Sequence, residues 1–457
     1  MGIRREHDML GDKDVPEDVY WGIHTARAIE NFPLVSGRVA GVLIRAMALV
    51  KKACAQANCD LGYLVSEKAA PIIAACDDVA AGKLADEFPL DALQGGAGTS
   101  TNMNLNEVIA NRALELMGKG RGDYAALHPL DDVNCHQSTN DVYPTAVKVA
   151  GIFELRRLSE AIALLQGGLQ RKEKEFAGIV TLGRTEMQEA VPMTLGAQFA
   201  GFAEAFGRDR WRVFKCEERL RVVNLGGTVI GTGMGAPREY IFLVIEKLRE
   251  VTGLGVSRGE NPVGETMNGD VFVEVSGILK AHAVNILKMT GDLRLLNMLG
   301  EIKLPAVQAG SSMMPGKVNP VILEAAAQAA LKVCANDMLV AEAAGRATGQ
   351  IVEFMPLLAD AFLGSLALLN NAVQQLTVHI DGIQADEIRC RYYLDHSRMI
   401  ITAFVPTFGY DRCNGLLKEF DGAGEKNLRL FLEGKLGKAC VDKALSPHQL
   451  LGLGYRT

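Results

Sequence analysis

The sequence is poor in aromatic residues and has no cysteine pattern that would indicate a disulfide framework or a zinc site. Phe, Trp and Tyr make up 6% of the 457 residues, which argues against an aromatic-rich β-sandwich and favours closely packed helices rich in Ala and Leu. The nine cysteines are scattered and contain no C-x-x-C pair. A reducing, cytoplasmic setting is therefore the simplest expectation.

Positive charge and long apolar runs are also scarce. Lys and Arg number 48 against 54 Asp and Glu, the net charge is -6, and no run of five or more basic residues occurs; a nucleic-acid face or a basic membrane patch is therefore not expected. The N-terminal MGIRREHDML lacks a signal-peptide core, and no uncharged apolar stretch approaches the roughly 18 residues of a membrane span. We expect a soluble protein without nucleic-acid or membrane partners.

Helical periodicity is abundant from about residue 140 onward. Apolar residues recur every three or four positions, as in Leu195, Phe199, Phe202 and Phe206. The pattern predicts five long helices, at 144–176, 193–223, 270–297, 321–344 and 357–380. A helix of 30 residues is about 45 Å long, so five of them indicate an elongated bundle, and apolar residues on several faces indicate packing against partner subunits. We predict a mostly α protein that forms a homo-oligomer.

Three regions differ in how often Gly and Pro interrupt this pattern. Residues 1–136 hold shorter helical runs, such as 41–58 and 66–82, and read as a mainly helical domain. Residues 137–391 form the central long-helix domain, and residues 392–457 form a small C-terminal domain of short helices and turns.

Four polar, Gly-rich segments lie at the boundaries of these helices. They are GGAGTSTNMNLNE (95–107), HQSTNDVYPT (136–145), GRTEMQEAVPMT (183–194) and GSSMMPGKVNP (310–320). The donors we single out in them are hydroxyls and amides with the single cation of Lys317, and they suit a small dicarboxylate whose oxygens each accept several hydrogen bonds. They are Thr99, Ser100, Ser138, Thr139, Asn140, Thr185, Ser311, Ser312, Lys317 and Asn319. Helix capping accounts for the Ser, Thr and Asn at 138–140, but it does not require Lys317 or the doubled serine at 311–312.

These motifs resemble those of the aspartase/fumarase superfamily, and the resemblance runs through nearly the whole chain. GSSMMPGKVNP is its most specific part; the others are LGDKDVPEDVYWGIHTARAIENF, GGAGTSTNMNLNEVIANRA, QSTNDVYPTA, GRTEMQEAVPMTLG and NLGGTVIGTG. GIHTARAIENF, GAGTSTNMN, STND and AVQAGSS look more like aspartate ammonia-lyases than fumarases. The family implies a three-domain helical subunit and a homotetramer with a 20-helix core, in which each active site is shared between subunits.

The resemblance also implies a reaction and its residues. The reaction is the reversible anti-elimination of ammonia from L-aspartate to fumarate through an aci-carboxylate intermediate, without a cofactor or a metal ligand. Ser311 is the implied general base, acting as an alkoxide. The implied donors to the β-carboxylate, where charge develops, are Thr99, Ser138, Thr139 and Ser312. The α-carboxylate is held by Thr185, Lys317 and Asn319, and Asn140 lies near the amine. Gly310 and Gly316 are expected to let the loop open and close.

Glu186 departs from the family pattern, in which His or Gln usually follows the Thr of GRT. A carboxylate there repels a dianion, so Glu186 is protonated, paired with a cation or turned away. If it faces the leaving group, it suits an ammonium better than a hydroxyl and favours C–N over C–O cleavage. A C–N lyase acting on an N-substituted aspartate, a class II fumarate hydratase and a catalytically silent structural member stay open as alternatives.

Three weaker signals have structural interpretations. Arg27 matches a family position linked to activity, but an ion pair explains it equally well, and His24 is expected to be structural. GTGMGAP (231–237) follows no clear strand and lacks the acidic partner of a dinucleotide-binding unit, so a turn is expected. The histidine spacing gives no metal motif.

Overall fold

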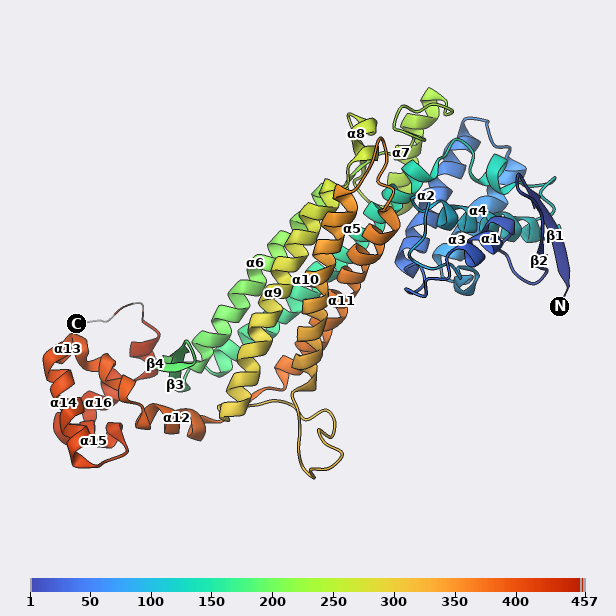
Figure 1. Cartoon of the computed structure of the whole chain (residues 1–457). Helices are drawn as coiled ribbons and strands as arrows, with labels where there is room; N and C mark the ends of the chain where they lie inside the picture. The colour runs from blue at the N-terminus through green and yellow to red at the C-terminus, as the bar shows by residue number, and fades with distance from the viewer. Residues whose placement is uncertain (1, 453, 455–457) are drawn as a thin grey trace. The chain divides into compact units, whose positions relative to one another are not determined.

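The computed structural model describes residues 2–452 and 454 and is mostly helical (Figure 1). The chain divides into two compact units. Unit 1 comprises residues 1–158, 212–281 and 332–370, and unit 2 comprises residues 159–211, 282–331 and 371–457. The three-domain division made from the sequence stays a prediction.

The five predicted long helices are confirmed, with ends that differ by a few residues. They are α5 (Thr139–Glu175), α6 (Leu195–Leu220), α9 (Asp270–Leu299), α10 (Val321–Gly345) and α11 (Met355–Asp381). Each of them runs from one unit into the other, and Figure 1 shows them side by side.

The part of the bundle in unit 1 is packed through small and aromatic residues. A Cβ on Gly151 of α5 would lie 2.9 Å from both Leu220 of α6 and Phe362 of α11, so only a glycine permits this approach. Phe362 also meets Phe272 of α9 edge to face at 5.5 Å. Asn336 of α10 is buried and donates to α11.

The part in unit 2 repeats this close packing. A Cβ on Gly196 of α6 would lie 2.5 Å from the Glu173 carbonyl oxygen of α5. Helices α6 and α9 share a buried polar contact, in which His282 Nδ1 lies 2.9 Å from an oxygen of Asp209 and both side chains are fully buried. A glycine thus allows close helix packing in both units, against side chains in unit 1 and against the backbone in unit 2.

The rest of unit 1 is built from short elements around a helical layer. Its strands are β1 (Ile3–Asp8), β2 (Gly11–Pro16), β5 (Val222–Val223) and β6 (Ser257–Arg258), with β1–β2 antiparallel and β5–β6 parallel. Its shorter helices are α1 (Ile23–Asn31), α2 (Gly41–Asp60), α3 (Ser66–Ala80), η1 (Ala85–Glu87), α4 (Thr99–Leu116), η2 (Pro129–Val133), α7 (Arg238–Thr252) and α8 (Pro262–Met267). Helices α2 and α3 confirm the two predicted shorter runs.

The rest of unit 2 holds the β3–β4 hairpin, a second antiparallel strand pair and the C-terminal helices. Antiparallel strands are β3 (Val180–Thr185) with β4 (Gln188–Thr194), and β7 (Ile302–Lys303) with β8 (Gln384–Ala385). The remaining helices are α12 (Glu387–His396), η3 (Arg398–Phe404), α13 (Val405–Phe408), α14 (Tyr410–Ala423), α15 (Leu428–Leu436), α16 (Lys438–Ala444) and α17 (Pro447–Leu450). Leu182 of β3 joins the apolar core of these helices.

Two features outside the motifs bear on earlier expectations. The segment 231–237 consists of turns and bends, with positive φ at Gly231, Gly233 and Gly235, which confirms the turn interpretation. Among the described helices, α11 has the length and composition of a membrane span, but 67% of its most apolar window is buried inside the protein, as is usual for a core helix.

Candidate active site

The ten residues predicted to form the site lie in three places. In unit 1, four of them stand at the N-terminal ends of α4 and α5: Thr99, Ser138, Thr139 and Asn140. In unit 2, Thr185 and Glu186 lie at the β3–β4 turn, and one loop between β7 and α10 carries Ser311, Ser312, Lys317 and Asn319.

The start of α5 is held by a reciprocal cap. Ser138 Oγ accepts from the Asn140 N–H at 3.2 Å, and Asp141 accepts from the Ser138 N–H at 3.0 Å. This is the arrangement of a capping box, so the capping interpretation of this segment is confirmed. Asp141 is buried and also accepts from the N–H groups of Gly226 and Thr228. Burial raises the pKa of Asp141 to about 6, against the lowering effect of these N–H groups.

Pro144 lies inside the first turns of α5, where the sequence interpretation had the helix begin. A proline in a helix leaves the carbonyl four residues earlier without its donor. That carbonyl belongs to Asn140, and Asn224 Nδ2 donates to it at 2.9 Å. Asn140 in turn donates its side-chain amide to the Val229 carbonyl at 2.7 Å. The NLGGTV segment (224–229) therefore replaces the lost helix bond and orients Asn140.

The start of α4 packs directly against α5. Gly98 precedes the helix with φ of +94°, and a Cβ there would lie 2.5 Å from the ring of Tyr143. Thr99 Oγ1 donates to the Gly96 carbonyl at 2.7 Å. Asn102 Nδ2 donates to Thr139 Oγ1 at 3.1 Å. The N-termini of two helices thus adjoin, and the positive ends of their dipoles favour a bound anion.

Buried polar residues behind these N-termini were missed by the sequence reasoning. Lys51 of α2 is fully buried and donates to Asn134 Oδ1 at 2.7 Å, and the same oxygen accepts from Asn102 and Asn106 at 3.2 Å each. The available signal was a lysine on the apolar face of a helix, four residues after Met47 and three before Cys54, where a charge needs a partner.

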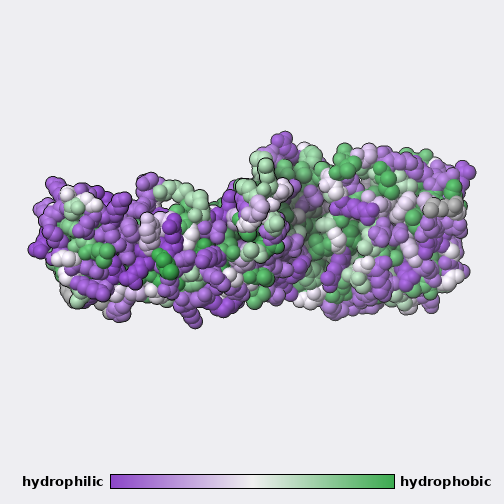
Figure 2. Space-filling model, turned by 90° about the horizontal axis from the view of Figure 1, so that it is seen from below, coloured by the Kyte–Doolittle hydropathy of each residue, from purple (hydrophilic) through white to green (hydrophobic). Residues whose placement is uncertain are grey.

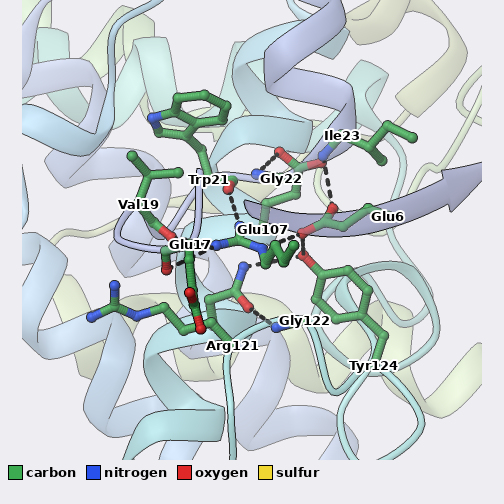
Figure 3. A network of polar contacts seen from close by, with 12 residues as sticks. Glu6, Glu17, Val19, Trp21, Gly22, Ile23, Glu107, Arg121, Gly122 and Tyr124 are labelled. Atoms are coloured by element: carbon green, nitrogen blue, oxygen red, sulfur yellow. Dashed lines mark hydrogen bonds and ion pairs between the residues drawn. The ribbon is translucent and has the colours of Figure 1, made fainter. Parts of the chain in front are cut away.

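A second buried carboxylate, Glu107 of α4, fixes helix α1. Its oxygens accept from the backbone N–H groups of Gly22, His24 and Thr25 and from the Thr25 hydroxyl, at 2.6–3.2 Å. Figure 3 shows Glu107 beside Glu6, which accepts from the Ile23 N–H at 2.8 Å. Both carboxylates thus satisfy the unpaired N–H groups at the start of α1.

The two residues of α1 noted in the sequence have structural contacts. His24 contributes its backbone N–H to Glu107, and burial lowers the pKa of its side chain. Arg27 binds both oxygens of Asp8, at 2.8 and 2.9 Å, which is the ion-pair interpretation of this residue.

Glu107 makes the stability of this region pH-dependent. Burial raises its pKa from 4.5 to about 7, so the folded protein binds more protons than the unfolded chain between these values, and stability falls as the pH rises through them. We expect the free energy of unfolding of the wild type relative to Glu107→Gln to decrease by up to about 3 kcal/mol between pH 4.5 and 8. Chemical or thermal unfolding at several pH values measures it. A difference that stays constant over this pH range would contradict the assignment.

The β3–β4 turn presents Thr185 and Glu186 to solvent. Glu186 and Met187 have φ of +51° and +62°, the left-handed pair of a two-residue hairpin turn. No hydrogen bond or ion pair of Glu186 occurs within residues 2–452 and 454, so in the isolated chain its carboxylate is exposed. Arg184 anchors the hairpin through an ion pair at 2.7 Å to Glu301, which is fully buried.

The loop 310–320 is closed at its base by its own backbone. Gly310 N–H donates to the Lys317 carbonyl at 2.8 Å, and Asn319 Nδ2 donates to the Gly310 carbonyl at 2.8 Å. Within the loop, Ser311 Oγ accepts from the N–H groups of Met313 and Met314 at 3.1 and 2.9 Å. Ser312 and Lys317 are exposed. In the described part of the chain, no hydrogen bond or ion pair joins this loop to the β3–β4 turn.

The described residues contain no group of three or more His, Cys, Asp or Glu side chains arranged to hold a metal ion. The candidate site residues supply mainly hydroxyls and amides, with the ammonium of Lys317, and these groups suit an organic anion.

Comparisons with known proteins agree with this chemistry. Residues 11–335 match the family model described as lyase. The aspartate ammonia-lyase of Escherichia coli (strain K12) is 42% identical over 99% of this chain and 97% of its own length, and that of Bacillus sp is 40% identical over 98% and 97%. Among solved structures, a fumarate lyase:delta crystallin from Brucella melitensis bound to cobalt gives a TM-score of 0.93 at 43% identity, covering 99% of this chain and 100% of that one.

A class II fumarase from Schistosoma mansoni is also similar in structure, with a TM-score of 0.91, 29% identity and coverage of 98% and 99%. The fold and the match over nearly the full length of these proteins define a lyase. The chain belongs to the aspartase/fumarase superfamily, and its sequence is nearer to the aspartate ammonia-lyases named above than to this fumarase.

Proposed function

We propose that the chain is a carbon–nitrogen lyase that removes ammonia from L-aspartate to give fumarate, reversibly and by anti-elimination. The mechanism is supported by the position of Ser311, whose Oγ accepts hydrogen bonds from two backbone N–H groups. The identity to aspartate ammonia-lyases carries the choice of substrate.

Ser311 is the proposed general base. A serine hydroxyl is a weak base at neutral pH, so its alkoxide must be stabilised. The N–H groups of Met313 and Met314 point at Oγ from within the same turn, and preorganised donors of this kind stabilise a negative oxygen strongly where water is excluded. The proton is taken from the carbon next to the β-carboxylate, and the electron pair spreads onto that carboxylate as an aci-carboxylate before ammonia leaves.

The ends of α4 and α5 form the proposed carboxylate-binding part of the site. The hydroxyls of Ser138 and Thr139 stand at a helix N-terminus, where an anion is favoured. Thr185, Lys317 and Asn319 are proposed to hold the other carboxylate, with Ser312 and Thr99 completing the donors. Asn319 and Thr99 already donate hydrogen bonds within their own loops. The conformation of each loop therefore sets the direction in which these two side chains can bind substrate.

We propose that these parts meet between subunits of a homotetramer with a 20-helix core. Residues 138–140 belong to unit 1, and Thr185 and the loop 310–320 belong to unit 2. The resemblance to the superfamily supports a site that residues of several subunits complete. Exposed apolar side chains on the long helices, such as Leu331, Met338 and Val378 at 59–77%, support such a contact. Figure 2 shows hydrophobic surface among the hydrophilic surface on the face it presents. The nine free cysteines support a reducing, cytoplasmic setting.

A substrate panel tests the function. We expect fumarate to form from aspartate, with little or no turnover of malate, argininosuccinate or adenylosuccinate, as followed by ultraviolet absorbance. Turnover of malate alone would overturn the proposal in favour of a fumarate hydratase, and turnover of a larger amine alone would favour an N-substituted aspartate. An inactive tetramer would favour a structural role.

Glu186 is the proposed contact to the leaving ammonium. In the same assay, Glu186→Gln is expected to raise the KM for aspartate by about tenfold, because a carboxylate binds an ammonium more strongly than an amide does. Unchanged kcat and KM would show that the side chain does not reach the amine.

A further inference from the structure

The buried network behind the α5 N-terminus ends on one of the proposed substrate-binding hydroxyls. Lys51 Nζ donates to Asn134 Oδ1 at 2.7 Å, Asn102 Nδ2 donates to that oxygen at 3.2 Å, and Asn102 Nδ2 also donates to Thr139 Oγ1 at 3.1 Å. The four side chains come from α2, the segment after η2, α4 and α5. They form one continuous path from a buried cation to Thr139.

The cation determines the direction of every hydrogen bond in this path. An ammonium has only donors, so Asn134 must turn its oxygen toward Lys51. The amides of Asn102 and Asn106 must then turn their NH₂ groups toward Asn134, and their own buried oxygens are left without a partner in the described part of the chain. An unpaired buried oxygen is unfavourable, which indicates that Lys51 imposes this orientation.

The orientation of Asn102 in turn decides what Thr139 can do. Thr139 Oγ1 receives a hydrogen from Asn102, and no acceptor for its own hydrogen occurs among residues 2–452 and 454. Thr139 is 8% exposed, at the end of α5 where the substrate carboxylate is proposed to bind. A hydroxyl that already accepts one hydrogen bond presents its hydrogen outward, as a carboxylate requires.

We propose that Lys51 is a positioning residue of the carboxylate site, which acts through Asn134 and Asn102 to keep Thr139 a hydrogen-bond donor to the substrate. The inference rests on the proposed function, because that proposal places Thr139 beside the carboxylate. Lys51 carries its charge near neutral pH, since burial lowers its pKa only to about 8. Its titratable neighbours are Asp141, Cys54 and Cys76, and burial raises the pKa of both thiols well above their usual value.

A double-mutant cycle tests this role, with succinate as a non-reacting dicarboxylate probe whose Kd is measured by calorimetry. Lys51→Met and Thr139→Val are each expected to raise the Kd for succinate and the KM for aspartate by about tenfold or more. The double variant should bind succinate as Thr139→Val does, within about twofold, because Lys51 then has no hydroxyl to orient. If Lys51 had a purely structural role, the factors by which the two substitutions raise the Kd would multiply in the double variant.

The matched control is Lys52→Met. Lys52 is adjacent to Lys51 in α2 but pairs with Asp77 of α3 at 2.7 Å. The Lys52→Met variant should therefore bind succinate with the wild-type Kd. If Lys51→Met does not fold, as judged by circular dichroism and subunit assembly, Asn102→Leu enters the same cycle, since it removes the donor to Thr139 directly. Unchanged succinate binding in the folded variant, or effects that multiply with Thr139→Val, would overturn the proposal.

The probe also separates this inference from the proposed function. Wild-type protein that binds succinate but releases no fumarate from aspartate contradicts the proposed function, and the cycle still decides on Lys51. Wild-type protein that does not bind succinate contradicts the carboxylate site and the positioning role together.

Discussion

Replacing Ser311 by alanine is expected to lower kcat for fumarate formation by roughly 100- to 10,000-fold, the range for loss of a general base. The variant keeps the loop's closing contacts, since those use Gly310, Lys317 and Asn319. Subunit assembly and the Kd for succinate should therefore change little. Steady-state rates with saturating aspartate measure the effect.

A control for the lost hydrogen bonds is Ser446→Ala. Ser446 Oγ accepts from the Gln449 N–H at the start of α17, so its removal deletes a similar local contact outside the proposed site, and activity should stay at the wild-type level. If Ser311→Ala keeps substantial activity, the base is another residue. If it loses succinate binding together with activity, Ser311 holds the loop rather than the proton.

Replacing Gly310 by alanine is expected to reduce kcat/KM by about 10- to 100-fold. A Cβ at this position would lie 2.8 Å from both the Asn319 backbone nitrogen and the Lys317 carbonyl oxygen. Because these are backbone atoms, the base of the loop must open, and Ser311 is displaced from its place in the turn. A displacement of a reacting group by about 1 Å can lower the reaction rate by about 100-fold.

The comparison variant is Gly422→Ala in α14, where nothing lies within 4 Å of the added Cβ and φ is not positive. It should leave kcat/KM unchanged and stabilise α14 slightly, since Ala favours a helix over Gly. Wild-type activity in Gly310→Ala would show that the loop tolerates an open base, contrary to its proposed role.

The long helices were predictable because their signal is local. Apolar residues at three- and four-residue spacing mark α5, α6, α9, α10 and α11 without reference to any other part of the chain. The start of α5 was placed too late, at Pro144, because proline normally begins a helix. Asn224, 80 residues further along, supplies the donor that lets α5 begin earlier, and no local pattern reports such a partner.

The candidate site was predictable only in part, because a sequence shows local patterns but not contacts between distant residues. The loop 310–320 holds its hydroxyls, cation and glycines in one short segment, so its chemistry is visible in the sequence. Glu107 and Lys51 were not singled out, because their partners lie 82–85 and 83 residues away. Most charged residues are exposed, so the sequence alone does not indicate that a particular one is buried.

The sequence by itself determined the helical class, the superfamily and the reaction chemistry, because periodicity and motif composition are properties of contiguous residues. Only the tertiary structure decided which hydroxyls are donors, how the serine loop is closed, and that a buried lysine stands behind Thr139. Hydrogen-bond direction depends on which groups meet in space, and the close approach at Gly310 depends on atoms seven and nine residues away. The packing of α2, α4 and α5 thus gives Thr139 its donor orientation.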